Sequence, residues 1–192
     1  MESTITNSLI LYGALLALIA LERVVELRIS KRNAAAILQQ GGSEHGQGHF
    51  PVMVLLHTAI FPACFLEAWL LERPWRVGLG IAMALLIALT MALRYWAIRS
   101  LGPHWNTRVI VLPDAKIVSK GPYQWIRHPN YLAVIIELAA MPLFHGAWIT
   151  MTTFGVANLF LLKHRIQVEE KALETHCDDL NHLSDKNRFL PR

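Results

Sequence analysis

The chain has 192 residues, of which 54% are hydrophobic and only 17% are charged, and its mean hydropathy is +0.35. This balance excludes an ordinary soluble domain of that length and indicates an integral membrane protein. The formal net charge of +4 fits attraction to an anionic membrane leaflet, so no nucleic-acid partner is needed to explain it.

Four apolar stretches follow one another, at about 8–27, 51–71, 77–98 and 131–162. Each of the first three matches the about 20 apolar residues that a helix needs to cross a bilayer. The fourth is too long for one crossing and is interrupted by Pro142 and Gly146, which predicts a helical hairpin. We therefore expect an all-α integral membrane protein with five transmembrane helices, the last two forming the hairpin.

The first stretch lacks both a basic n-region and a cleavage site of small residues, so we expect a retained helix and not a signal peptide. Charged side chains near its end are expected to pair with one another or with a neighbouring helix. In the second stretch, His57 and Glu67 are expected to make buried polar contacts between helices. The charged residues near the end of the first stretch are Glu22, Arg23 and Glu26.

The loop "QQGGSEHGQGHF" at 39–50 contains Glu44, His45 and His49, which are residue types that bind metals. Its glycines argue against a helix that would hold these side chains at a fixed spacing. We therefore expect no metal site in this loop.

Two longer polar segments follow the third and fifth helices. The segment 100–130 contains "TRVIVLPDAKIVSKGPY", whose β-branched runs around a Pro-Asp turn are compatible with short strands or with irregular loop. The segment 163–192 begins "KHRIQVEEKALETH", where apolar residues recur at helical spacing, so we expect the fifth helix to continue into the cytoplasm. A site built from both segments would lie at the membrane surface.

Basic residues follow the first, third and fifth helices, whereas the opposite side carries only Arg73 and Arg76. Because Lys and Arg collect in short cytoplasmic loops, this distribution predicts the N-terminus outside and the C-terminus in the cytoplasm. The residues assigned to the cytoplasmic side include Arg28, Lys31 and Arg32 after the first helix and Arg94 at the end of the third.

Two polar groups have both a structural and a functional interpretation. The "RHPNY" run at 127–131 suits a helix start with an aromatic membrane anchor. Arg165 and Glu169 are one helical turn apart, so they suit a solvated ion pair on one helix face. Alternatively, both groups point into a pocket at the membrane boundary, where ionisable side chains usually mark function.

Taken in order, "GPYQWIRHPNYL", a hydrophobic hairpin, "RIQVEE" and a tail ending in "RFLP" resemble the isoprenylcysteine carboxyl methyltransferase family. These are small membrane enzymes that use S-adenosylmethionine, and the resemblance covers roughly residues 100–192. It implies a single membrane domain over 1–192, with three transmembrane helices in 1–99. Residues 100–192 would then hold a cofactor-binding loop, the helical hairpin and a cytoplasmic C-terminal helix and tail.

The resemblance also implies which residues bind S-adenosylmethionine. Arg165 matches the arginine that the family assigns to the substrate side. The tail departs from the family pattern, because it lacks the tyrosine pair that commonly follows the glutamates. The implied cofactor contacts are the backbone of Ala115, Lys116, Ile117 and Val118, together with Tyr123, His128, Pro129, Asn130, Tyr131 and Glu169.

The residue types fit this chemistry. Methyl transfer from a sulfonium to an anionic oxygen cancels charge, so a desolvated site favours it, and Arg165 can hold such an oxygen by a two-pronged contact. We expect an O-methyltransferase whose lipophilic acceptor enters from the bilayer, either a prenylcysteine-type carboxylate or a long-chain polyketide-type hydroxyl. "ELRISKRN" and "EHGQGHFP" are similar to a subgroup suspected of methylating polyketide-type lipids.

Two other functions are compatible with a small helical membrane protein. One is a membrane reductase of the sterol-reductase type that uses NADPH, but the chain is short for it and shows no extra basic cluster for a phosphate. The other is a non-enzymatic membrane scaffold, which would place polar residues at the membrane midplane, whereas here they gather at one boundary.

Overall fold

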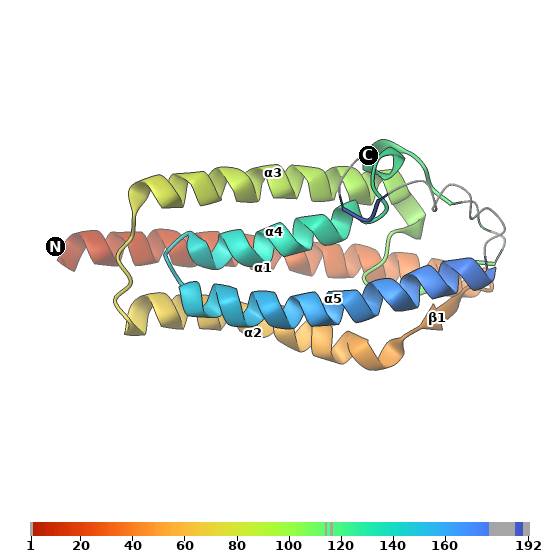
Figure 1. Ribbon diagram of the computed structural model, residues 1–192, viewed down its shortest axis with the longest axis horizontal. Coiled ribbons are helices and arrows are strands. Elements are labelled where there is room, and N and C mark those ends of the chain that lie inside the picture. The colour runs from red at the N-terminus through yellow and green to blue at the C-terminus, as the bar shows by residue number, and fades with distance from the viewer. Residues whose placement is uncertain (1, 114, 116, 177–186, 190–192) are drawn as a thin grey trace.

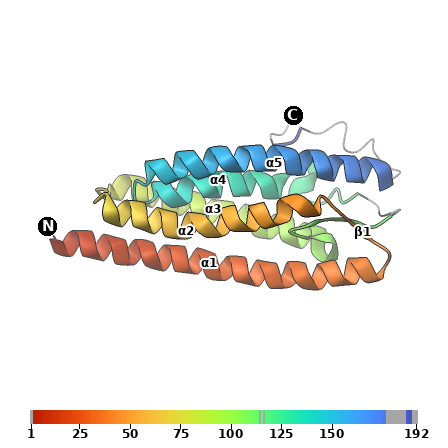
Figure 2. The same cartoon turned by 90° about the horizontal axis from the view of Figure 1, so that it is seen from below.

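The computed structural model describes residues 2–113, 115, 117–176 and 187–189. Five helices in this part of the chain lie side by side, and each runs antiparallel to the one before it (Figure 1). Figure 2 shows α1 along one face of the bundle and α5 on the opposite face. The helices are α1 (Glu2–Gln39), α2 (Phe50–Leu70), α3 (Val77–Leu101), α4 (Pro129–Leu143) and α5 (Trp148–His176).

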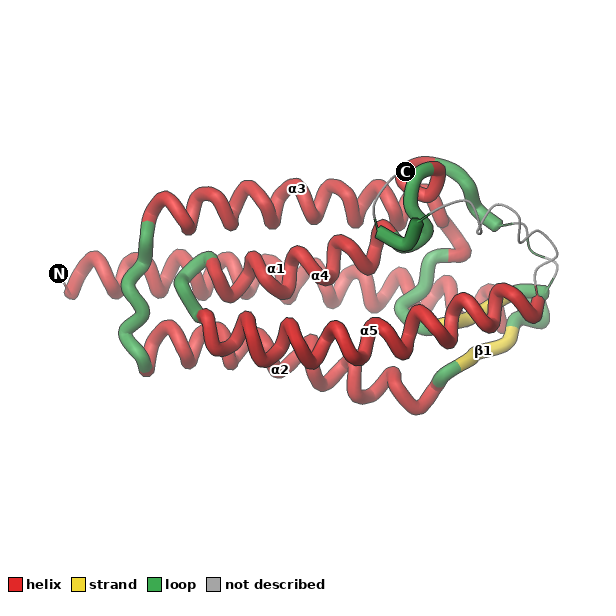
Figure 3. Tube along the Cα trace, in the orientation of Figure 1, coloured by secondary structure: helices red, strands yellow, loops and turns green. Residues whose placement is uncertain are grey.

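Short elements gather at one end of the bundle, opposite the start of α1 (Figure 3). Two three-residue strands, β1 (Ser43–His45) and β2 (Val109–Val111), pair antiparallel there. The fold is mostly helical, as predicted, and of the two β-branched runs the first forms a strand, whereas the described residues of the second, Ile117 and Val118, do not. Three 3₁₀ turns complete this end: η1 (Gln47–His49), η2 (Gly102–His104) and η3 (Gly121–Gln124).

Three helices are long and apolar enough to cross a membrane within the part of the chain that the structure describes. Their segments are Thr6–Gln39, Gln47–Leu70 and Val77–His104. The predicted hairpin is present as α4 and α5, and a tight turn with Gly146 at φ 72° joins them. With 15 residues, α4 is about 22 Å long and shorter than the about 30 Å of bilayer hydrocarbon.

The first helix is longer than its apolar stretch indicates. It continues to Gln39, so Arg28, Lys31 and Arg32 lie on the helix and do not follow it. No glycine or proline interrupts "RISKRNAAAILQ", and the helix ends only before Gly41, which adopts φ 91°. Likewise α5 is continuous to His176, as the helical spacing predicts.

A network of charged side chains lies inside the bundle and joins three helices. Glu26 of α1 accepts two hydrogen bonds from Arg94 of α3, at 2.5 and 2.7 Å, and one from Arg23 at 2.6 Å. Glu137 of α4 lies 3.2 Å from Arg23 and 3.7 Å from Arg94. Arg94 is therefore a buried partner of carboxylates inside the bundle, and counting it with the basic residues that mark the cytoplasmic side was wrong.

Glu67 of α2 holds the start of α5. Its carboxylate accepts the backbone N–H groups of Ile149 at 3.1 Å and Thr150 at 2.6 Å, and Arg73 donates to it at 2.9 Å. The first N–H groups of a helix have no partner within the helix, and a carboxylate at this position satisfies them and opposes the helix dipole. This confirms the expected contact between helices.

The loop residues that resemble metal ligands have separate partners. Glu44 pairs with Arg108 at 3.2 Å. The His45 ring lies against His176, and the His49 ring contacts His164. The described part of the chain contains no group of three side chains placed to hold a metal ion.

Candidate functional site

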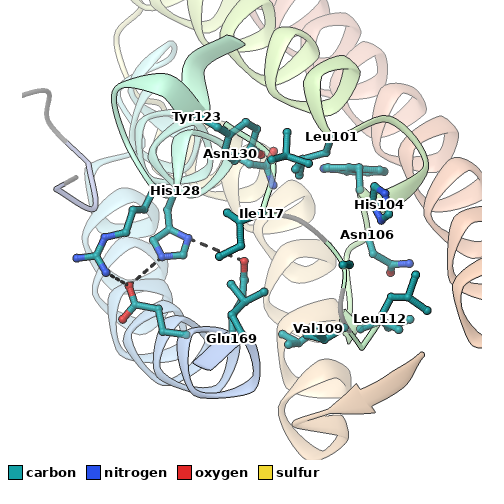
Figure 4. A pocket seen from close by; sticks show the side chains of 18 of the residues that line it. Leu101, His104, Asn106, Val109, Leu112, Ile117, Tyr123, His128, Asn130 and Glu169 are labelled. Atoms are coloured by element: carbon teal, nitrogen blue, oxygen red, sulfur yellow. Dashed lines mark hydrogen bonds and ion pairs between the residues drawn. The ribbon is translucent and has the colours of Figure 1, made fainter. Parts of the chain in front are cut away.

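A cavity of about 190 Å³ lies at the end of the bundle that holds the strands (Figure 4). The segment from η2 to η3, the start of α4 and the polar half of α5 form its walls. We call it the polar pocket. Its lining includes Trp105, Asn106, Val109, Val111, Ala115, Ile117, Val118, Tyr123, Arg127, His128, Asn130, Tyr131, Glu169 and Glu170.

Most of the residues that the sequence places at the cofactor line this pocket, although they come from three separate segments. Pro129, which begins α4 and is buried, is not in the lining. Lys116 lies outside the described residues. The candidates in the lining are Ala115, Ile117, Val118, Tyr123, His128, Asn130, Tyr131 and Glu169.

Two carboxylates, Glu169 and Glu170, contact His128 on one wall of the polar pocket. His128 donates from Nε2 to Glu170 at 3.1 Å, and its Nδ1 lies 4.0 Å from Glu169 (Figure 4). Arg127 and Arg188 also donate to Glu170, at 3.1 and 2.6 Å. Burial opposes ionisation of Glu170, but the hydrogen bonds from His128 and Arg188 outweigh it and lower its pKa to about 2. Glu170 is therefore anionic at neutral pH.

The segment 187–189 is fixed against the same corner. The backbone N–H groups of Arg127 and His128 donate to the carbonyls of Asn187 and Arg188, both at 3.0 Å. Phe189 packs on the cluster that contains Tyr131. The arginine of the "RFLP" ending thus reaches the pocket wall through Glu170, whereas Leu190 and Pro191 lie outside the described residues.

Three buried polar atoms of lining residues lack a partner among the described residues, and one of them is Nε of Arg127. The other two are Oδ1 of Asn130 and Nε1 of Trp105. Leaving a buried donor or acceptor unsatisfied costs about 1 to 3 kcal/mol. A ligand that supplies one donor and one acceptor would therefore satisfy the Asn130 and Trp105 atoms.

A second cavity of about 280 Å³ lies between the helices, next to the polar pocket. Its walls are mostly apolar, so we call it the apolar cavity. Arg165 of α5 is 5% exposed and lines this cavity, not the polar pocket. Other lining residues are Val24, Met53, His57, Phe61, Val134, Asn158, Leu161 and Leu162, with Arg23, Glu26 and Arg94 of the charged network.

Tyr131 and Asn130 line both cavities. The Tyr131 hydroxyl donates to Glu169 on the side of the polar pocket and accepts a hydrogen bond from Nε of Arg165, at 2.7 Å, on the other side. Within the described chain, Arg165 and Glu169 form no direct ion pair. The solvated ion pair of the structural interpretation is thus absent there, and a tyrosine connects the two charges.

Sequence reasoning missed the residues that hold the wall around Trp105. Ser30 of α1 accepts a hydrogen bond from the Thr107 backbone N–H at 2.9 Å. Asn33 donates to the carbonyls of Gly102 and Trp105, at 3.2 and 2.8 Å. The signal for this contact in the sequence is two polar residues, three positions apart, on the extension of α1. Such a pair does not identify partners that lie 69 or more residues away in the chain.

These features define a multi-pass helical membrane protein in which a polar pocket and an apolar cavity share one wall. A family model described as the isoprenylcysteine carboxyl methyltransferase (ICMT) family matches residues 82–175. The chain belongs to this family, as the motifs in its C-terminal half predict.

Two bacterial relatives align over most of their length. The uncharacterized protein YpbQ of Bacillus subtilis is 36% identical over 167 residues, which cover 86% of this chain and 98% of the relative. An uncharacterized protein of Haemophilus influenzae is 29% identical over 152 residues, which cover 79% of this chain and 88% of the relative.

The fold is similar to a solved structure of the eukaryotic intramembrane Ras methyltransferase ICMT. The TM-score is 0.53 and the sequence identity is 20%, with 70% of this chain covered. The match spans 49% of the eukaryotic chain, so this protein corresponds to about half of it.

Proposed function

We propose that this protein is an S-adenosylmethionine-dependent methyltransferase that methylates an oxygen of a lipophilic acceptor. The observation that carries the proposal is the shared wall of the two cavities. A water-soluble donor in the polar pocket and a lipophilic acceptor in the apolar cavity would meet at Tyr131 and Asn130. Family membership supports methyl transfer and disfavours both the NADPH-dependent reductase and the scaffold.

The residues of the polar pocket fit S-adenosylmethionine. When bound, this cofactor supplies a methyl group activated by a sulfonium. Glu169 would pair with its ammonium group, and the unpartnered Asn130 Oδ1 and Trp105 Nε1 would bond to its polar atoms. Val109 and Ile117 form apolar walls suited to a nucleobase. Burial, with the nearby Glu169 charge, raises the pKa of Tyr123, so its phenol stays neutral.

The apolar cavity fits the hydrocarbon part of an acceptor. Its Leu, Val and Phe side chains would hold the chain, while Arg165 would hold the reacting oxygen with its planar fork. We infer that the protein accelerates transfer by aligning the two reactants and excluding water, without a covalent enzyme intermediate. A prenylcysteine-type carboxylate and a long-chain polyketide-type hydroxyl both suit this geometry.

Binding and transfer assays test the proposal. Purified protein is titrated with S-adenosylmethionine and with NADPH, and methyl transfer from labelled S-adenosylmethionine is measured with prenylcysteines and with long-chain phenols or pyrones. Binding of S-adenosylmethionine with transfer to one of these acceptors supports the proposal. Binding of NADPH alone, or of neither compound, contradicts it.

We also propose that all five helices span the membrane, with the N-terminus outside and the polar pocket and C-terminus on the cytoplasmic side. The first residues of α1 and the end of α5 lie at opposite ends of the bundle, which supports termini on opposite sides of the membrane (Figure 1). Single cysteines placed near each terminus, after replacement of Cys64 and Cys177, are expected to react with an impermeant reagent from opposite sides. Labelling of both from one side would rule out an odd number of crossings.

The change Glu169→Gln is expected to weaken S-adenosylmethionine binding by about 1.5 to 3 kcal/mol, because a hydrogen bond between charged groups is lost. Calorimetry on the purified variant measures the effect. Glu174→Gln is a matched control, since Glu174 is exposed on the same helix and does not line the polar pocket. Wild-type affinity in Glu169→Gln would remove Glu169 from the cofactor site.

A further inference from the structure

We propose that His57 is a catalytic base of the apolar cavity, and that its Nε2 receives the proton of a hydroxyl acceptor during methyl transfer. The inference rests on the proposed methyltransferase function. It adds a residue that neither the sequence motifs nor the polar pocket includes. His57 is on α2, and it lines the same cavity as Arg165 and Tyr131.

The hydrogen bond of His57 determines which ring nitrogen is free. Nδ1 lies 2.8 Å from the carbonyl oxygen of Met53, one turn earlier on α2. A carbonyl only accepts, so Nδ1 carries a hydrogen, and in the neutral ring Nε2 keeps its lone pair. The expectation of a contact from His57 to another helix was wrong, because this bond is to its own helix.

The free nitrogen of His57 is available to a ligand. Among the described residues, Nε2 makes no hydrogen bond, and the side chain is half-buried at the cavity wall. Met53, which holds Nδ1, also contacts Nη1 of Arg165 through its sulfur at 3.1 Å. The base and the proposed oxygen-binding fork are thus connected through one methionine.

The charged groups around His57 favour an oxyanion close to its ring. Three arginines, Arg94, Arg23 and Arg165, line the same cavity as His57. The other charged or titratable groups at the cavity are Glu26 on α1, whose carboxylate is bonded to Arg94 and Arg23, and Tyr131 on α4. The free lone pair on Nε2 can accept a proton, and the arginines would stabilise the oxygen that loses it.

The step balances as a proton transfer coupled to methyl transfer. The acceptor oxygen forms the new O–CH₃ bond, and the CH₃–S bond breaks with its electron pair left on sulfur. The O–H bond breaks with its electrons left on oxygen, and its proton goes to Nε2 of His57. The ring returns to neutral by releasing this proton to water. An acceptor that is already ionised has no proton to lose and does not need His57.

The different need of protonated and ionised acceptors for His57 can be tested directly. Two phenols with the same long alkyl chain are compared: a plain phenol, which is protonated at neutral pH, and a dinitrophenol, which is ionised. In His57→Gln and in His57→Asn, methylation of the plain phenol is expected to fall by about 10² to 10⁴-fold. Methylation of the dinitrophenol should stay close to wild type. His164→Gln is the matched control, because His164 is exposed and lines neither cavity.

A second readout needs no turnover. A long-chain mononitrophenol changes its absorption on ionisation, and without cofactor the bound probe should ionise at lower pH in the wild type than in His57→Gln. Calorimetry with S-adenosylmethionine checks that each variant is folded, since His57 does not line the polar pocket.

Equal losses on the plain phenol and the dinitrophenol, or no loss on either, would overturn the role of His57. So would a wild-type protein that methylates prenylcysteine carboxylates but no phenol, and this result would leave the proposed methyltransferase function intact. Failure of the wild type to bind S-adenosylmethionine would reject both proposals together.

Discussion

Replacing Arg165 with lysine is expected to lower methyl transfer on the order of 10²-fold, with S-adenosylmethionine affinity nearly unchanged. The guanidinium donates to Tyr131 and contacts Met53 from a buried position, so its plane is fixed relative to the apolar cavity. Lysine keeps the charge but loses the planar fork, and displacing a reactant by about 1 Å can cost 10²-fold in rate. Transfer from labelled cofactor and calorimetric titration of the same variant measure the two effects.

The control is the same substitution at an exposed arginine. Arg99 lies on α3 against the Tyr95 ring and lines neither cavity, so Arg99→Lys should behave as wild type. If Arg165→Lys loses cofactor affinity and turnover in equal proportion, Arg165 belongs to the donor site and its assignment to the acceptor is wrong.

The change Arg94→Met is expected to destabilise the bundle by about 3 to 5 kcal/mol, which is the usual cost of removing one partner from a buried ion pair. Glu26 would lose two short hydrogen bonds, and Glu137 would lose a nearby cation. The free energy of unfolding in detergent micelles, measured by titration with a denaturing detergent, gives the size of the loss.

Two further variants separate this mechanism from a simple loss of packing. Arg99→Met makes the same substitution on the exposed face of α3 and should cost little. Arg94→Met combined with Glu26→Leu removes both charges and should recover part of the stability, because no carboxylate of Glu26 is left buried alone. A loss below about 1 kcal/mol in Arg94→Met would be typical of a surface pair and would contradict a buried network.

Local signals in the sequence predict the hairpin and the length of α5. Pro142 and Gly146 disrupt a helix by their own covalent structure, and the helical spacing after Lys163 needs no partner to be recognised. The end of α1 is harder, because a hydropathy pattern stops at the last apolar residue, whereas the helix continues to Gln39. Its extension is stabilised by Ser30, which contacts Asn106, 76 residues later.

In the candidate site, too, local motifs can be predicted from the sequence, whereas contacts between distant segments cannot. The run from His128 to Tyr131 and the two glutamates are contiguous motifs, so the sequence alone indicates them. Trp105, Arg94 and His57 carry no motif, and they gain their environment only when α1, α2 and α3 come together. Charge sorting counted Arg94 with the basic residues of the cytoplasmic side for this reason, since a count of charges takes no account of a carboxylate 68 residues away.

The single hydroxyl of Tyr131 has a thermodynamic consequence. It hydrogen-bonds to Glu169 of the polar pocket and to Arg165 of the apolar cavity. A ligand in either cavity that replaces one of these hydrogen bonds therefore changes the other one as well. Ligand binding to the polar pocket and to the apolar cavity is then heterotropically linked. The coupling free energy has the same value whichever ligand binds first. An inert lipid bound beside Arg165 would alter the affinity for a ligand of the polar pocket without contacting that ligand, and the ligand would alter the affinity for the lipid by the same factor.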